Sequence, residues 1–200
     1  MKKFALFLTL IFLQISYADD GNVKSFINLV ANDVIKVAGN DSYSQKQKAA
    51  HMMEIMRTNF NVKWMSKFVL GSSYKDLNDK QKDEYYNSYQ KYLLYSYLPN
   101  LLQYSDETFK ILEVRRMGDR DYTVDTEIIR HNGKPPIKIG YHVKTSKTGD
   151  SMKIVDIIAE GISAILSQRS EFKEITQNSG VSGLIKLINN KNVQFNQQYS

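Results

Sequence analysis

Hydrophobic and polar residues alternate with two different periodicities along the chain, and the periodicity changes near residue 108. Before it, apolar residues recur three or four positions apart, which is the spacing of one face of an α-helix. This spacing predicts helices over 23–37, 44–58 and 79–98, with a short apolar stretch at 62–71. Pro99 is expected to kink or end the third helix, because proline has no N–H to donate.

The second half of the chain has the two-residue period of β-strands. Between 137 and 145, Ile137, Ile139, Tyr141 and Val143 alternate with polar or small residues, which predicts one buried face. Short connectors rich in glycine, proline, asparagine and aspartate join consecutive strands and imply antiparallel pairing. The predicted strands are Phe109–Arg116, Tyr122–Ile129, Ile137–Thr145 and Met152–Ala159.

The last strand runs directly into a helix at Gly161. Helices are expected over 162–177 and 181–190, separated by Gly180, and the polar tail 191–200 is expected to fray. Asp156 lies inside an almost continuous apolar run, so its carboxylate needs a partner or solvent, because burying a lone charge is costly.

These elements predict an α+β fold. A four-stranded twisted antiparallel sheet is covered by several helices, as in an NTF2-like cone with a helical subdomain, in one domain over 19–190. The N-terminus has the form of a signal peptide over 1–18: Lys2 and Lys3 precede an apolar run, and Ser16–Tyr17–Ala18 fits the cleavage rule. We therefore expect cleavage after Ala18 and export.

Composition excludes several kinds of chemistry. The chain has no cysteine, so it has no disulfides, thiolate zinc sites or cysteine nucleophiles. Its formal net charge is +6. This mild excess is compatible with an anionic membrane or an acidic partner. No stripe of arginine and lysine indicates nucleic-acid binding.

Metal and hydrolase motifs are also missing from the sequence. The three histidines, His51, His131 and His142, do not have a metal-ligand spacing. Gly161–Ile165 begins like the nucleophile elbow of a hydrolase but ends in isoleucine where that motif has glycine. We expect no catalytic residue, no metal and no cofactor.

Tyrosine is unusually dense between residues 85 and 104, where seven of the thirteen tyrosines lie. A tyrosine combines a wide apolar body with a hydroxyl that seeks water or a partner, which suits the mouth and wall of an apolar pocket. The alternative is a helix that packs on a sheet with its hydroxyls at the edge.

Several short motifs occur in an order that resembles one family. The main motif, K-[IV]-x-D-[IV]-x-x-E-G-[IV]-S followed by R-S-x-F, is matched from Lys153 to Phe172. Other matches are Asn59, Phe60, Gly71, Gln81, Lys82, Leu93, Leu94, Tyr97, Leu101, Tyr104, Val124, Thr126, Ile128, Pro136, Ile139 and Tyr141. Together they resemble the MlaC, or toluene-tolerance, family over most of 23–190. Met152 and Asn61 depart from it, since the family usually has tryptophan and an acid there.

The resemblance implies a monomeric periplasmic carrier that binds phospholipid. Such a carrier shuttles lipid between an outer-membrane lipoprotein complex and an inner-membrane ABC transporter with an MCE-domain protein. We expect the acyl chains to lie in an apolar cavity between sheet and helices. The periodicities nominate as inward-facing Trp64, Phe68, Tyr89, Leu93, Tyr97, Leu101, Val124, Ile139, Tyr141, Ile154 and Ile162.

Two alternatives remain open on the sequence. One is an exported NTF2-like enzyme with Asp156 as general base and Tyr141 as hydrogen-bond donor, which requires both side chains in one pocket. The other is a non-catalytic protein-binding module with a solid core. The charged residues Asp156, Glu160 and Arg169 fit either an ion-pair network that pins the strand-to-helix turn or a docking surface at the lip of a pocket.

Overall fold

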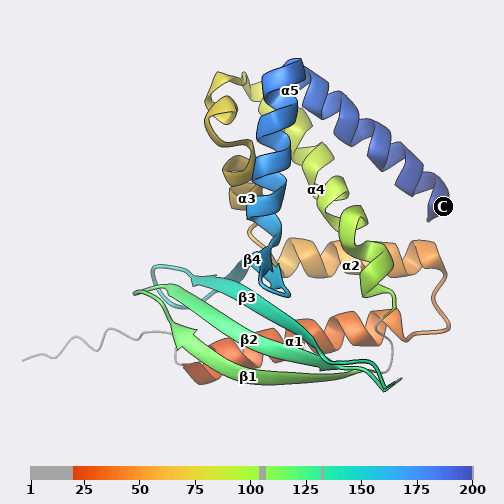
Figure 1. Ribbon diagram of the computed structural model, residues 1–200, viewed down its shortest axis with the longest axis vertical. Helices are drawn as coiled ribbons and strands as arrows, with labels where there is room; N and C mark the ends of the chain where they lie inside the picture. Colours follow the sequence, from red (N-terminus) through yellow and green to blue (C-terminus); the bar gives the residue numbers. More distant parts are fainter. Residues whose placement is uncertain (1–19, 104–106, 132, 200) are drawn as a thin grey trace, which may run out of the picture.

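The computed structural model describes residues 20–103, 107–131 and 133–199. The predicted signal peptide and Tyr104 of the family motif lie outside these residues. A layer of helices stands on one edge of a curved sheet (Figure 1), which gives the α+β arrangement that the sequence predicts. In the described part of the chain, no helix has both the length and the apolar character needed to cross a membrane.

The sheet is antiparallel and its strands follow chain order, β1-β2-β3-β4-β5. The four predicted strands are confirmed to within a residue, and a two-residue strand that was not predicted, β5, pairs with the end of β4. The register shifts between Ile111 and Glu113 and again between His142 and Val143. Such bulges bend and twist a sheet. The strands are β1 (Thr108–Arg116), β2 (Asp121–Ile129), β3 (Ile137–Thr145), β4 (Met152–Ala159) and β5 (Ile162–Ser163).

The register separates an apolar face of the sheet from a polar one. Val114, Val124, Tyr141 and Ile157 lie side by side across β1 to β4. The next row, Arg115, Thr123, His142 and Asp156, therefore points to the opposite face. Helix α1 (Asp20–Ala38) covers part of the apolar face. The buried residues there, which we call the sheet core, are Val23, Ile27, Val30, Tyr122, Val124, Val143 and Ile154.

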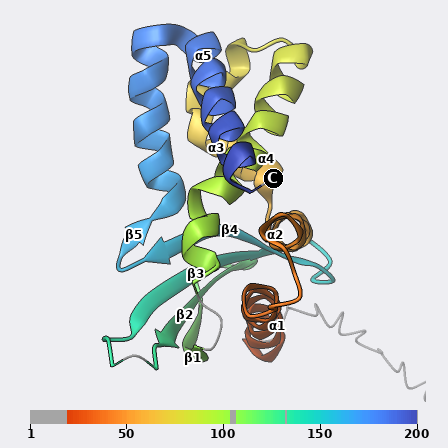
Figure 2. The same ribbon diagram turned by 90° about the vertical axis from the view of Figure 1, so that its right-hand side faces the viewer.

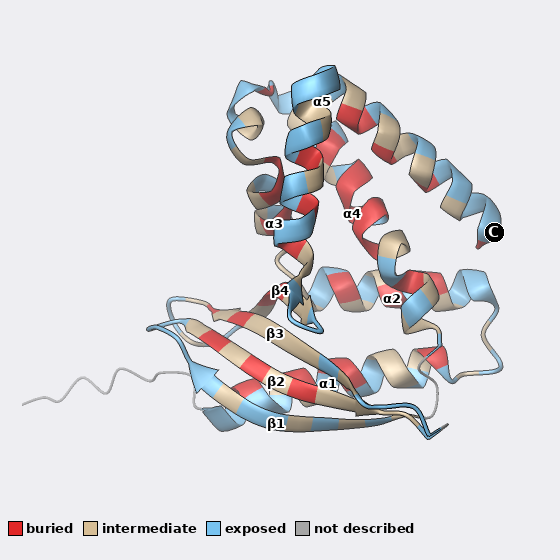
Figure 3. Cartoon of the chain, viewed as in Figure 1, coloured by how far each residue is buried: buried red, intermediate tan, exposed pale blue. Residues whose placement is uncertain are grey.

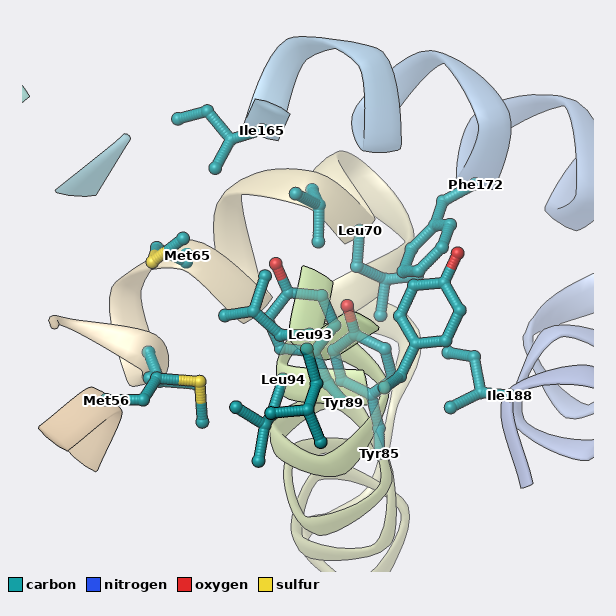
Figure 4. Packing of buried hydrophobic residues seen from close by; sticks show 14 of the residues in the cluster. Met56, Met65, Leu70, Tyr85, Tyr89, Leu93, Leu94, Ile165, Phe172 and Ile188 are labelled. Carbon is teal, nitrogen blue, oxygen red and sulfur yellow. The ribbon is translucent and has the colours of Figure 1, made fainter. Parts of the chain in front are cut away.

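The other helices form a second cluster of buried residues, which we call the helical core. It lies among α2 (Gln45–Asn59), α3 (Val62–Leu70), α4 (Asp79–Leu101) and α5 (Ala164–Gln198), with the short 3-10 helix η1 (Gly71–Asp76) between α3 and α4. Tyr85 and Tyr89 of α4 point into it (Figure 4), and both are fully buried. Their hydroxyls donate to the Ser66 carbonyl oxygen at 2.9 Å and to Gln168 Oε1 at 2.8 Å.

Helix boundaries follow from capping side chains. Asn78 caps α4: its side chain accepts from the Gln81 backbone N–H at 2.9 Å, while Gln81 Oε1 accepts from the Asn78 backbone N–H at 3.0 Å. Asn61 caps α3, because its Oδ1 accepts from the Trp64 backbone N–H at 3.1 Å. Asparagine can cap a helix as well as the acid it replaces in the family pattern. Helix α4 continues through Pro99 and ends at Leu101.

Helix α5 contains the predicted break, because Gly180 has a φ of 66° and a ψ of 177°. The expected fraying of the tail is wrong. The helix continues to Gln198, because its polar side chains bond to α4. Asn192 Nδ2 donates to the Ser88 carbonyl oxygen at 2.9 Å, and the Tyr95 hydroxyl donates to Asn196 Oδ1 at 2.7 Å. We call the part of α5 after Gly180 its second arm. Figure 3 shows buried residues on the side of this second arm that faces α4.

Candidate functional site

The buried apolar residues of this protein fall into two separate clusters, the sheet core and the helical core. A domain usually has one contiguous core. The half-buried side chains of Ile55 and Phe60 pack against both clusters. We call the boundary between the two cores the seam. An apolar ligand could separate two such layers here, because each layer already has its own packed interior.

Half-buried apolar side chains line the sheet side of the seam. Phe109, Tyr141 and Ile157 pack against the sheet core without being fully buried, and the rings of Phe109 and Tyr141 meet edge to face at 6.4 Å. Burial raises the pKa of the Tyr141 phenol, yet the side chain keeps some accessible surface.

The end of α4 forms the helical side of the seam. This end reaches down beside the sheet, next to α1 and α2 (Figure 2). Leu101 and Leu102 are half-buried against the helical core. Tyr97 is 37% exposed, and its pKa is raised by burial and by Tyr92, Asp156 and Glu171, which places it beside the start of α5. Leu101 and Leu102 make the helical side of the seam apolar.

The structure divides the predicted site residues into two groups. Val124 and Ile154 are fully buried in the sheet core, and Tyr89 and Leu93 are buried in the helical core. These four side chains fill packed interior in this structure. The side chains that keep accessible surface are Tyr97, Leu101, Ile139 and Tyr141. Ile139 is half-buried beside Thr126 and Ala159.

Three other predicted residues lie away from the seam. Trp64 and Phe68 of α3 stack on each other at 5.0 Å, with Lys144 over the first ring and Arg169 over the second. The expected inward orientation is wrong for Ile162, which is 66% exposed. It belongs to the edge strand β5, one residue before Ser163 caps α5.

The sequence analysis missed Ile55, Phe109 and Ile157 as candidates. Phe109 begins a predicted strand, and its alternation with Lys110 was a usable signal. Ile157 could not be assigned to a face, because the bulge in β4 changes the phase of the alternation after Ile154. Ile55 lies on a predicted helix, and only the tertiary structure brings it against both cores.

Asp156 has the partners that its buried position requires. Its carboxylate accepts from the Ser163 hydroxyl at 2.6 Å and from the Ile165 backbone N–H at 3.2 Å, which fixes the start of α5. Asp156 pairs with His142 and lies on the polar face, whereas Tyr141 lies on the apolar face. The arrangement that the enzyme hypothesis requires, with both side chains in one pocket, is therefore not the one observed.

The other two charged residues of the motif bond mainly to backbone groups. Glu160 Oε1 accepts from the Lys138 backbone N–H at 2.7 Å. Arg169 donates to the Phe68 carbonyl oxygen at 2.5 Å and lies 4.7 Å from the Phe68 ring. Of the two interpretations left open by the sequence, neither an ion-pair network nor a docking surface is seen in these bonds, which tie the turn to β3 and α5 to the end of α3.

Two open clefts lie outside the predicted site. One of about 340 Å³ lies between α1 and α2, and a more polar one of about 400 Å³ lies between α4 and the second arm of α5. Over the described ranges, no group of three or more histidine, cysteine, aspartate or glutamate side chains could hold a metal ion.

Comparisons with known proteins agree with this architecture. The chain is 23% identical over 145 residues to the intermembrane phospholipid transport system binding protein MlaC of Haemophilus influenzae, covering 70% of this chain and 68% of that protein. Its fold matches the solved phospholipid-binding protein of Ralstonia solanacearum, which was determined in complex with a phospholipid. The TM-score is 0.73 at 18% identity, over 86% of this chain and 97% of the other. The family model described as MlaC protein matches residues 28–190. This chain therefore belongs to the MlaC family.

Proposed function

We propose that this protein binds phospholipid in the periplasm and carries it between the outer membrane and an inner-membrane ABC transporter. Three findings support this function: membership of the MlaC family, a relative whose name describes phospholipid transport, and a similar fold solved with a bound phospholipid. The partners would be an outer-membrane lipoprotein complex and an ABC transporter with an MCE-domain protein. Export would depend on the signal peptide predicted at 1–18.

The physical requirement for such a carrier is an apolar enclosure. Exposing acyl chains to water costs about 0.8 kcal/mol for each methylene, so a lipid crosses an aqueous compartment only inside a protein. We infer that the seam meets this requirement when lipid is bound. The observation that carries the proposal is that the packed interior is divided into two cores, with half-buried apolar side chains at their boundary.

We assign the acyl chains to the seam. The side chains proposed to contact them are the predicted Tyr97, Leu101, Ile139 and Tyr141, together with Ile55, Phe109 and Ile157. Four other predicted residues would pack behind these side chains without contacting the lipid, because they are already buried in the two cores. They are Tyr89, Leu93, Val124 and Ile154.

Lipid extraction tests the proposed function directly. The chain without residues 1–18 is purified, and its bound lipid is extracted and quantified by mass spectrometry. We expect phospholipid to be recovered with the wild-type protein. Ile139→Arg should lower the bound lipid more than about tenfold, because an unpaired charge in hydrocarbon costs several kcal/mol. Since Ile139 is only half-buried, the variant should keep the fold.

The matched control is the same substitution at an exposed isoleucine of the same sheet. Ile162→Arg should retain bound lipid, because Ile162 is 66% exposed. Equal lipid content in wild type and in a folded Ile139→Arg variant would contradict the pocket assignment. A wild-type protein from which no phospholipid can be extracted, even after incubation with vesicles, would instead support the solid-core binding module.

A further inference from the structure

The cleft between α1 and α2 is built from two matching stripes of side chains. Its lining residues follow helical spacing on both walls, at positions i, i+3, i+4 and i+7, so each stripe forms one face of its helix. The two helices lie side by side on the same side of the sheet (Figures 1 and 2). The first stripe is Asp33, Lys36 and Val37 of α1, continued by Asn40 just beyond the end of that helix, and the stripe on α2 is His51, Glu54, Ile55 and Thr58.

The apolar part of the cleft is continuous with the seam. Val37 packs against the helical core, and Ile55 packs against both cores. Ile55 therefore belongs to the lining of the cleft and to the boundary where the proposed acyl chains lie. A molecule with an apolar body in the seam would have its polar end in this cleft.

The rim of the cleft carries exposed charged side chains that could contact a ligand. Asp33 and Lys36 are exposed, and neither forms a hydrogen bond or an ion pair with the described residues. Glu54 is also exposed, and its one contact of this kind is a long hydrogen bond of 3.4 Å from the Thr58 hydroxyl on its own helix. His51 stacks on Tyr43 with the ring centroids 4.6 Å apart. The rim therefore offers two carboxylates and one ammonium group at an apolar floor.

We propose that this cleft receives the headgroup of the bound lipid, and that it favours a phosphodiester carrying a terminal ammonium over an anionic headgroup. This inference rests on the proposed function. Lys36 would attract the phosphate, while Asp33 and Glu54 would attract the ammonium. Asp33, Lys36 and Glu54 bring two negative groups and one positive group to the rim, so a headgroup that carries its own ammonium is favoured over one that carries only a phosphate.

A competition between two lipids tests this preference. The chain without residues 1–18 is incubated with vesicles of equal phosphatidylethanolamine and phosphatidylglycerol, and the bound lipids are counted by mass spectrometry. We expect the wild type to be enriched about threefold in phosphatidylethanolamine, which is the scale of exposed charge interactions. The double variant Asp33→Asn/Glu54→Gln should lose this enrichment and keep its total lipid.

The control removes the same two charges elsewhere. Asp83→Asn/Glu174→Gln changes exposed acids of α4 and α5 that lie outside the cleft, so it should keep the wild-type ratio. Circular dichroism during heating checks that both double variants are folded. If both double variants change the ratio of the two bound lipids equally, the effect comes from the net charge of the protein and not from the cleft. That result would overturn the assignment.

The remaining outcomes separate the two proposals. Bound lipid with no headgroup preference in the wild type overturns the cleft assignment and leaves the carrier function standing. No bound lipid of either kind overturns both. Soluble glycerophosphoethanolamine serves as a further probe: if it binds at micromolar concentration and Asp33→Asn/Glu54→Gln abolishes its binding, the cleft is a site for a free phosphodiester and not for a lipid headgroup.

Discussion

The two cores of this protein are built in different ways. The sheet core is mostly aliphatic, and its members come from α1 and from alternate positions of β2, β3 and β4. The helical core contains buried tyrosines and lies beside buried polar groups such as Gln168 and Asn192. The second core depends on hydrogen bonds of its buried tyrosines as well as on packing. Sequence alternation describes the first core well and the second poorly.

The largest loss of stability should follow from emptying the centre of the helical core. Phe172 is fully buried and contacts the rings of Tyr89 and Tyr92 with centroid distances of 6.2 and 5.7 Å. Phe172→Ala should lower the free energy of unfolding by about 3–5 kcal/mol, from lost contacts and the cavity left behind. Urea denaturation measures this, and a loss below about 1 kcal/mol would mean that the helical core is not closely packed.

Alkaline pH should destabilise the helical core. Burial raises the pKa of Tyr85 and Tyr89 well above 10.0. Since the folded pKa is the raised one, this stability is present below pH 10 and is lost as the pH rises above it. Each of the two tyrosines should lower the free energy of unfolding by about 1.4 kcal/mol for each pH unit above 10. Denaturation at pH 9 to 11 tests this, and equal stability across that range would contradict it.

A smaller effect is expected from removing one buried hydrogen bond of the helical core. Tyr89→Phe removes the hydroxyl that donates to Gln168 Oε1 and leaves that buried oxygen without this partner. The free energy of unfolding should fall by about 1–3 kcal/mol. Tyr43→Phe is a matched control, because Tyr43 is only half-buried and should change stability by less than about 0.5 kcal/mol. Equal losses in both variants would contradict the role of the bond.

Asn192 should be replaceable at almost no cost. Its Oδ1 is buried and has no hydrogen-bond partner among the described residues, while its Nδ2 donates to the Ser88 carbonyl oxygen. Asn192→Leu removes the unpaired oxygen together with the bond, so stability should stay within about 1 kcal/mol of wild type or rise. Asn192→Ala, which leaves a cavity, should be less stable than Asn192→Leu. The reverse order in thermal unfolding would show that the Ser88 bond dominates.

The smallest effect is expected on the polar face of the sheet. Burial alone would raise the pKa of Asp121, but hydrogen bonds from Lys144 and His142 outweigh it and lower that pKa below 3.8. The resulting stability is present above the ordinary carboxyl pKa and is lost as the pH falls through the lowered value. Asp121→Asn removes this contribution. The difference in the free energy of unfolding between wild type and Asp121→Asn should therefore become smaller as the pH is lowered from 6 to 3. A gap that stays constant over this range would contradict the assignment.

The sequence determined most of the secondary structure and part of the site. Capping residues such as Asn78, the break at Gly180 and the alternation of Ile137 to Val143 are local signals, and the structure follows them. Of the residues nominated from the sequence, Leu101, Ile139 and Tyr141 are half-buried and Tyr97 is exposed, and their contact with lipid stays a prediction. Periodicity gives this much because it reports which side of an element is apolar.

Tertiary structure alone decided which apolar residues fill the interior and which keep accessible surface at the seam. Val124 and Tyr141 are directly paired on the same face, yet the first is fully buried and the second is not. Alternation cannot separate them, because the difference depends on what the opposite layer places over each one. The same reason explains why Ile162 points outward and why the tail is helical. Ile162 lies in the edge strand of the sheet and is 66% exposed, whereas the tail lies beside α4 and forms hydrogen bonds with it.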